Sequence, residues 1–264
     1  MEPLKVLVKE SYSELVSLLK WFSLFAPIPT IIGGWAVYFY NSYFGSIDID
    51  IVGPSHRGLF MDLIERYERT HGYEFIAKNQ LGLEATSRKP VTRNSKIIGY
   101  MEIDVCTFED PKPSGFHENP DKQLPYSLTS ENRYRREVKL DENAVCHIPR
   151  KPLLLLYKIK AVRDRTYDLR TKGAVIELAK VEKLRGKITK DRADILALID
   201  PNPSKYLIRE SFDADAFHDL VKRFKLEFSL TTLTELPKHR DSIQLYNPKL
   251  DGKQIQKWIK TIIG

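Results

Sequence analysis

Three carboxylates in the first half of the chain are spaced so that they could bind a divalent cation. Asp48 and Asp50 alternate with branched apolar residues across residues 47–52, which predicts a β-strand with both carboxylates on one face. At an effective dielectric of about 20, two such charges about 4 Å apart repel by about 4 kcal/mol. Mg²⁺ or Mn²⁺ would relieve this repulsion, because both prefer oxygen ligands and keep positions for water and substrate phosphates.

A third carboxylate from a neighbouring strand would let the site hold two metal ions. Residues 96–108 predict a long strand on which Glu102 and Asp104 project to the same side. We select Asp104 as the third ligand and keep Glu102 as the alternative. Two metal ions held in this way can clamp the attacking and leaving oxygens of an in-line phosphoryl displacement.

A glycine pair upstream could bind the phosphates of a nucleotide. Gly33 and Gly34 precede residues 35–43, which predict a short helix. Their unobstructed amides and the helix N-terminus could therefore accept a triphosphate. Taken alone, a Gly-Gly pair more often marks a turn, so the inference depends on the residues downstream of the pair.

The order and spacing of these residues resemble the signature of the DNA polymerase β-like nucleotidyltransferase superfamily. The match consists of three segments. They are Ile32-Gly33-Gly34, then Asp48-Ile49-Asp50-Ile51 after thirteen further residues, and a distal Ile103-Asp104-Val105. The resemblance implies a metal-dependent transfer of a nucleoside monophosphate from an NTP to an acceptor hydroxyl, with release of pyrophosphate.

The same resemblance implies a role for each matched residue. Asp48 and Asp50 would bind both metal ions, and Asp104 would bind the catalytic metal and assist the incoming nucleophile. Phosphates would be contacted by Gly33, Gly34 and Ser46. Many relatives carry an arginine two residues before the Ser or Thr of this motif, where this chain has Phe44.

A second motif downstream looks like that of the abortive-infection type toxin nucleotidyltransferases. It reads Lys158-Ile-Lys-Ala-Val-Arg-Asp-Arg165 and, about 24 residues later, Lys190-Asp191-Arg-Ala-Asp194-Ile195. The resemblance implies that Lys158 contacts the triphosphate and that Asp191 orients it, with Lys160 as the alternative lysine. The competing interpretation is a basic helix face with Lys158 in solvent.

Periodicity along the chain predicts an α+β protein: a mixed sheet flanked by helices, with the nucleotidyltransferase fold implied by the resemblance, followed by a helical domain. We expect a catalytic domain over residues 1–149 and a helical domain with a basic surface over residues 150–264. Expected strands are 47–52, 73–77, 83–87, 96–108, 136–140 and 144–148. Expected helices are 11–25, 35–43, 59–70, 153–165, 173–184, 190–199, 213–224 and 252–263, and 111–125 is expected to be a loop.

The basic charge is concentrated in one stretch and bears on the acceptor. Residues 133–192 hold 18 Lys and Arg against 8 Asp and Glu, a balance of +10, within a chain of net charge +7. This favours RNA as acceptor. The resemblance to the toxin nucleotidyltransferases implies the tRNA 3′ end as one candidate acceptor and an antitoxin as a candidate partner. A small-molecule or protein adenylyltransferase and a non-catalytic nucleotide- or RNA-binding module are the alternatives.

Several classes of protein are not expected from the sequence. The apolar runs are too short to span a bilayer, so no membrane association is expected. Charges within residues 1–10 argue against a signal peptide. Cys106 and Cys146 cannot build a disulfide framework and are expected to be reduced core residues of a cytoplasmic protein.

Overall fold

A computed structural model describes residues 2–25, 28–54, 59–78, 84–109, 114–172 and 177–264. The chain divides into two compact units, each of which draws on several stretches of sequence. We call them the sheet unit, residues 1–38, 45–113 and 125–150, and the helical unit, residues 39–44, 114–124 and 151–264. Each unit is described by itself.

The sheet unit is built on a seven-stranded mixed sheet with the strand order β3-β4-β5-β2-β1-β9-β8. Strands β2 and β5 are parallel, as are β1 and β9, and the other neighbouring pairs are antiparallel. The strands are β1 (Thr30–Ile31), β2 (Ile49–Gly53), β3 (Glu74–Lys78), β4 (Glu84–Arg93), β5 (Lys96–Thr107), β8 (Arg135–Asp141) and β9 (Ala144–Pro149).

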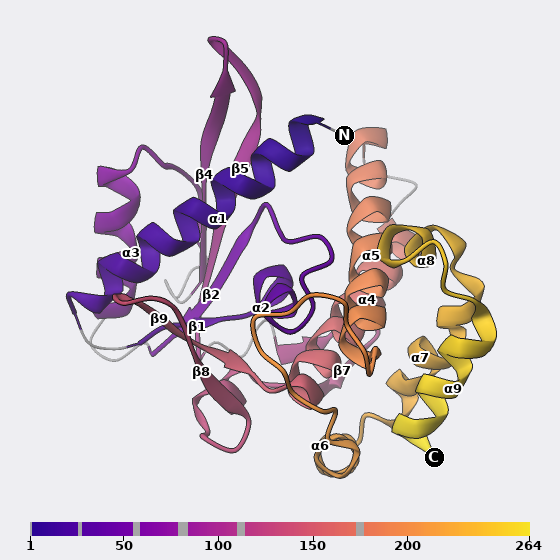
Figure 1. Ribbon diagram of the computed structural model, residues 1–264. Coiled ribbons are helices and arrows are strands. Elements are labelled where there is room, and N and C mark those ends of the chain that lie inside the picture. The colour runs from indigo at the N-terminus through magenta and orange to yellow at the C-terminus, as the bar shows by residue number, and fades with distance from the viewer. Residues whose placement is uncertain (1, 26–27, 55–58, 79–83, 110–113, 173–176) are drawn as a thin grey trace. The chain divides into compact units, whose positions relative to one another are not determined.

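Two helices of the sheet unit pack together, and one of them covers the sheet. Helix α1 (Glu2–Ser23) crosses the strands and packs on β5 and β9, and α3 (Leu59–Thr70) contacts α1 (Figure 1). Leu15, Leu18 and Leu19 of α1 are fully buried, and their three- and four-residue spacings place them on one side of the helix. On β5, Met101, Ile103 and Val105 alternate with less buried residues, as expected of a strand with one covered face.

The long β4–β5 hairpin extends past the other strands (Figure 1). Asn94 and Ser95, which connect the two strands, both have positive φ angles of 51° and 61°. Two successive residues of this kind form the tight turn whose twist matches that of antiparallel strands, and asparagine tolerates the left-handed conformation well.

The helical unit is built mainly from helices in the second half of the chain. Its two long helices, α4 (Lys151–Lys172) and α5 (Leu178–Ile199), pack against each other, and the four leucines 153–156 of α4 are buried. Around them lie α6 (Ala214–Phe224), α7 (Thr231–Glu235), α8 (Arg240–Tyr246), α9 (Gly252–Ile263) and the two-stranded sheet of β6 (Gly115–Phe116) and β7 (Asn119–Gln123). Helix α2 (Gly33–Tyr40) has residues in both units.

The sequence predicted some elements correctly and others wrongly. Helices 59–70 and 252–263 are confirmed at both ends, and a capping box at Asp251 explains the clear start of α9. The two helices expected at 173–184 and 190–199 are wrong: α5 is one helix that runs through Gly186, and residues 173–176 lie outside the described part of the chain. The loop expected at 111–125 is also wrong in part, because it contains β6 and β7, while residues 111–113 are not described.

In the described part of the chain, no helix is both long and apolar enough to cross a membrane. Cys106 and Cys146 are both buried, so the prediction that they are core residues is confirmed.

We predict that the buried face of β5 controls the stability of the sheet unit. Ile103→Ala should lower the free energy of unfolding by about 2–5 kcal/mol, because Ile103 is fully buried and the truncation leaves a cavity. The matched control is Ile97→Ala on the same strand, where the side chain is 56% exposed and the change should stay within about 0.5 kcal/mol. Urea unfolding of both variants measures the difference, and equal losses would contradict the assignment of the buried face.

Candidate active site

Asp50 and Asp104 lie side by side in the sheet. They are register partners on the parallel strands β2 and β5, and neighbouring strands are about 4.8 Å apart. Both alternate with buried residues, Ile49 and Ile51 on β2 and Ile103 on β5, so the two carboxylates leave the sheet on the face opposite to these isoleucines. The sheet therefore presents a pair of adjacent oxygen-donor side chains.

The Asp50 carboxylate lies against the start of helix α2. A Cβ atom at Gly33 would be 1.9 Å from Oδ2 of Asp50, and Gly33 has a φ of +65° that favours glycine. The backbone N–H of Ile32 donates to the carbonyl oxygen of Asp50 at 3.0 Å, which fixes the glycine pair next to β2. The partial positive charge at a helix N-terminus favours a carboxylate in this position.

Asp104, rather than Glu102, is the residue that is paired with Asp50. The hydroxyl of Thr86, the register partner of Asp104 on β4, donates to Oδ1 of Asp104 at 2.7 Å and so orients it. Glu102 is aligned instead with Arg88 and lies two residues, about 6.6 Å, further along β5.

Asp48 and Ser46 precede the strand rather than belonging to it. The strand expected over 47–52 begins at Ile49, so the prediction that Asp48 and Asp50 share the face of one strand is wrong. Ser46 is 6% exposed and Asp48 is half-buried. Within the described residues, no three His, Cys, Asp or Glu side chains are grouped as a metal site. The side chains of Ser46, Asp48, Asp50 and Asp104 nevertheless offer only oxygen atoms as metal ligands, which suits Mg²⁺ or Mn²⁺.

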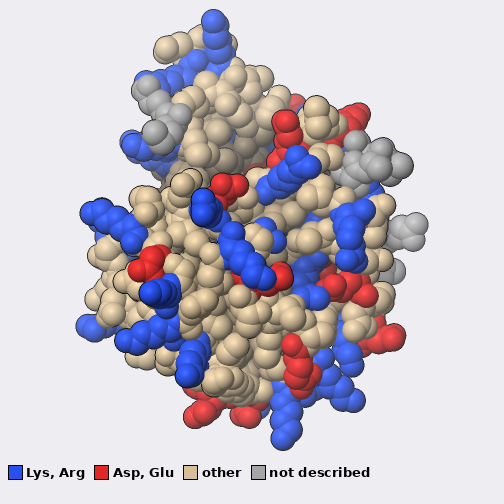
Figure 2. All heavy atoms as spheres, turned by 90° about the vertical axis from the view of Figure 1, so that its right-hand side faces the viewer, with Lys and Arg blue, Asp and Glu red and all other residues tan. Residues whose placement is uncertain are grey.

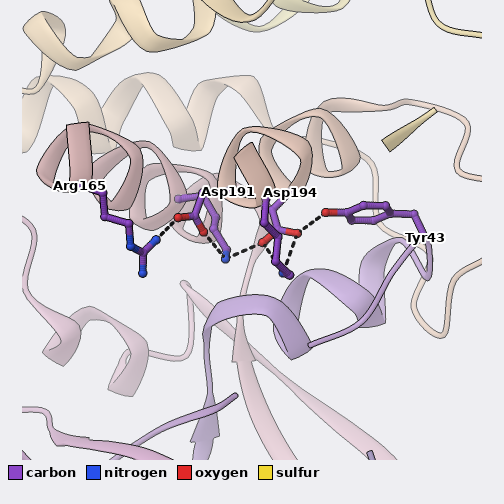
Figure 3. A network of polar contacts seen from close by, with 6 residues as sticks. Tyr43, Arg165, Asp191 and Asp194 are labelled. Carbon is purple, nitrogen blue, oxygen red and sulfur yellow. Dashed lines mark hydrogen bonds and ion pairs between the residues drawn. The ribbon is translucent and has the colours of Figure 1, made fainter. Parts of the chain in front are cut away.

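In the helical unit, Lys158 is a member of a buried ion-pair network. Its ammonium group lies 3.0 Å from Oδ1 of Asp191 and 2.6 Å from Oδ2 of Asp194, both on α5 (Figure 3). The side chain of Lys158 is only 8% exposed, so its interpretation as a solvated lysine on a basic helix face is wrong. Lys160 is not part of this network, because it pairs with Asp164 at 2.5 Å on another side of α4.

Three further residues complete the network around the two aspartates. Lys190 lies 3.0 Å from Oδ2 of Asp194, the hydroxyl of Tyr43 donates to Oδ1 of Asp194 at 2.6 Å, and Arg165 pairs with Asp191 (Figure 3). Two lysines and one arginine thus surround the two carboxylates.

The network shifts the pKa values of its members in opposite directions. Burial acts to raise the pKa of Asp194, but the charges of Lys158 and Lys190 and the hydrogen bonds from Lys158 and Tyr43 outweigh it and hold the pKa below its ordinary value. Burial, with the neighbouring Asp194 carboxylate, raises the pKa of Tyr43 well above its ordinary value. Asp194 is therefore ionised and Tyr43 is protonated at neutral pH.

Sequence reasoning quoted Asp194 in the second motif without giving it a role, and it missed Tyr43 as a member of the network. Asp194 stands three residues after Asp191, a spacing that puts both on one side of a helix, so a signal was available. For Tyr43 there was none, because its bond to Asp194 joins residues 151 positions apart.

The predicted basic surface is less concentrated than the sequence suggests. Lys151, Lys158 and Lys160 belong to the basic stretch 133–192 but are buried. Figure 2 shows Lys and Arg side chains spread over the face that it views, with Asp and Glu side chains between them.

Comparison of the sequence with protein-family models and with curated proteins finds no match.

We predict that Gly33 is required because of Asp50. Gly33→Ala should be less stable than Gly72→Ala, since both glycines have positive φ but only the Cβ at position 33 meets other atoms. Gly72→Ala should cost about 1–2 kcal/mol from the backbone alone, and Gly33→Ala at least about 1 kcal/mol more. Chemical unfolding measures the stability of both variants. Equal losses of stability would show that the Asp50 carboxylate can move away from the added methyl group at no energetic cost.

We predict a pH-dependent contribution from Asp194. Because its pKa is lowered in the folded chain, the stabilisation is complete above the ordinary value of 3.8 and is lost as the pH falls through the lower folded value. Asp194→Asn should be about 3–5 kcal/mol less stable than the native chain at neutral pH, with the gap narrowing below about pH 4. The exposed Asp219→Asn is the control and should show a small, constant gap. A gap for Asp194→Asn that does not change with pH would count against the network.

Proposed function

We propose that the chain is a metal-dependent nucleotidyltransferase of the DNA polymerase β-like superfamily, with its catalytic residues in the sheet unit. The observation that carries the proposal is the pairing of Asp50 with Asp104 on adjacent parallel strands, with Gly33 held against Asp50 at the start of a helix. A non-catalytic binding module has no need for two adjacent carboxylates whose repulsion it must offset. The nucleotidyltransferase fold is proposed on the same grounds.

In this proposal, Asp48, Asp50 and Asp104 hold Mg²⁺ or Mn²⁺ through carboxylate oxygens. The bound ions would neutralise the phosphates and polarise the reacting oxygens. Thr86 positions Asp104 through its hydrogen bond, and Asp104 assists the acceptor hydroxyl by accepting its proton. The amides of Gly33 and Gly34, together with Ser46, bind the phosphates.

The reaction joins the acceptor oxygen to the α-phosphorus of an NTP. The bond between that phosphorus and the bridging oxygen of the β-phosphate breaks, and pyrophosphate leaves with both electrons of that bond. The acceptor is thereby converted into a nucleoside monophosphate diester.

In the helical unit, Lys158 is the proposed triphosphate-contacting lysine and Asp191 the residue that orients it. Their ion pair of 3.0 Å supports the second role directly, because it holds the ammonium group in one place. The first role rests on the resemblance of the motif around Lys158. A phosphate that approached Lys158 would compete with Asp191 and Asp194 for its three donors.

RNA is the proposed acceptor, with a tRNA 3′ end as one candidate, and the net charge of +7 supports this choice. Neutral or cationic small molecules gain nothing from such a charge. Binding of RNA should weaken steeply as salt rises, because neutralised phosphates release counterions, whereas binding of a neutral acceptor should not.

The proposal is tested by incubating the chain with each α-labelled NTP, Mg²⁺ and either total RNA or total protein. We expect label in the RNA fraction with at least one nucleotide. Asp50→Asn and Asp104→Asn should each reduce labelling by about 10³-fold or more, because each removes a ligand that acts on the transition state. Asp62→Asn, an exposed carboxylate on α3, is the matched control and should keep native activity.

Four results would decide against the proposal or change its details. Absence of label with every NTP, or undiminished labelling in the Asp50→Asn variant, contradicts a nucleotidyltransferase. Full activity in Asp104→Asn together with loss in Glu102→Gln would transfer the role of third ligand to Glu102. Label in the protein fraction alone would make proteins the acceptor.

A further inference from the structure

A small cavity in the helical unit is lined by three arginines. It has a volume of about 240 Å³, and its walls come from α4, α5, α7 and the segment around β7. Arg163 and Arg170 reach it from α4 and Arg192 from α5, and the hydroxyl residues Thr231 and Thr232 line it from α7. The volume is below the roughly 300–1,000 Å³ of sites that take drug-sized ligands, so the cavity suits one small group.

This cavity is distinct from the Lys158 network. Residues seven apart on a helix lie on one side, so Arg163 and Arg170 share a face of α4, as do Lys158 and Arg165. At about 100° per residue, the two faces point about 140° apart. Neither Lys158 nor Asp191 or Asp194 lines the cavity.

The acidic residues around the cavity already have other cations. Glu118 pairs with Arg163, whose guanidinium group also donates to the hydroxyl of Thr231 at 2.8 Å. Glu235 pairs with Lys238 at 3.7 Å. These ion pairs do not include Arg170 or Arg192.

Among the described residues, no carboxylate holds either of these two arginines. Arg170 stacks over the ring of Tyr167 at 5.5 Å, and the guanidinium group of Arg192 makes no hydrogen bond or ion pair with the residues that the structure describes. Arg192 is half-buried, and burial lowers its pKa while Glu235 acts in the opposite direction. Burial, followed by the charge of Arg192, also lowers the pKa of His239, another residue of the cavity wall.

We propose that this cavity binds a phosphate group, held by Arg170 and Arg192 with the hydroxyl of Thr232. Planar guanidinium groups match the geometry of phosphate oxygens, and the hydroxyl supplies a further donor. The group could be a free phosphate or a phosphate of an RNA backbone. The inference does not rest on the proposed function, because it uses only residues outside the proposed catalytic site.

The test is a titration of the full chain with inorganic phosphate in the absence of divalent cations, followed by ³¹P NMR line broadening. Arg170→Ala and Arg192→Ala should each raise the dissociation constant by about tenfold, as expected for loss of a charge-assisted hydrogen bond. Arg185→Ala is the matched control, since this arginine is exposed on α5 and does not line the cavity. It should leave the constant within about twofold.

An RNA oligonucleotide without terminal phosphates separates the two sources of phosphate. If it displaces inorganic phosphate from the native chain but not from Arg192→Ala, the cavity holds backbone phosphates. If the oligonucleotide displaces no inorganic phosphate from the native chain, the cavity holds a free phosphate. The proposal is overturned if phosphate does not bind, or if Arg170→Ala and Arg192→Ala bind it as the native chain does. Because Arg170 is exposed, Arg170→Ala should fold, so its phosphate binding can be measured even if Arg192→Ala does not fold.

Discussion

The carboxylate of Asp50 can occupy its position only because residue 33 has no side chain. A Cβ there would overlap Oδ2, so the contact ties the start of α2 to strand β2. The parallel register of β2 and β5 then places Asp104 beside Asp50, and the hydroxyl of Thr86 on β4 holds Asp104 in place. One close approach therefore determines the arrangement of two carboxylates and a helix terminus, and the proposed chemistry depends on that arrangement.

The helical unit depends on a different electrostatic interaction, the one that stabilises the buried, ionised Asp194. An ionised aspartate as buried as Asp194 would be strongly destabilising by itself, because the protein interior solvates charge poorly. Lys158, Lys190 and the Tyr43 hydroxyl together replace the lost water. Such a network is rigid as long as it is complete and is costly when one member is removed. It is thus suited to hold a lysine in one defined position.

Local patterns in the sequence predicted those parts of the fold and site that local physics determines. Helices 59–70 and 252–263 have strong amphipathic spacing, and their ends are confirmed. Strand alternation and the glycine pair also led to Gly33, Asp50 and Asp104, which the fold brings together. The single helix α5 was misread as two, because Gly186 lowers local helix propensity while tertiary packing overrides it. Tyr43 could not be predicted, because its partner is distant in sequence.

The interleaving of the two units has a consequence for how the chain acquires its structure during synthesis. Residues 39–44 leave the ribosome early, yet Asn41 bonds to Ala197 and Ser42 to Lys205, which are made much later. Strand β1 likewise cannot pair with β9 until His147 has been made. Contacts that close such long loops form slowly. Neither unit can therefore mature as an independent module from a single uninterrupted stretch, and cutting the chain between residues 149 and 150 would leave residues 39–44 and 114–124 without their partners.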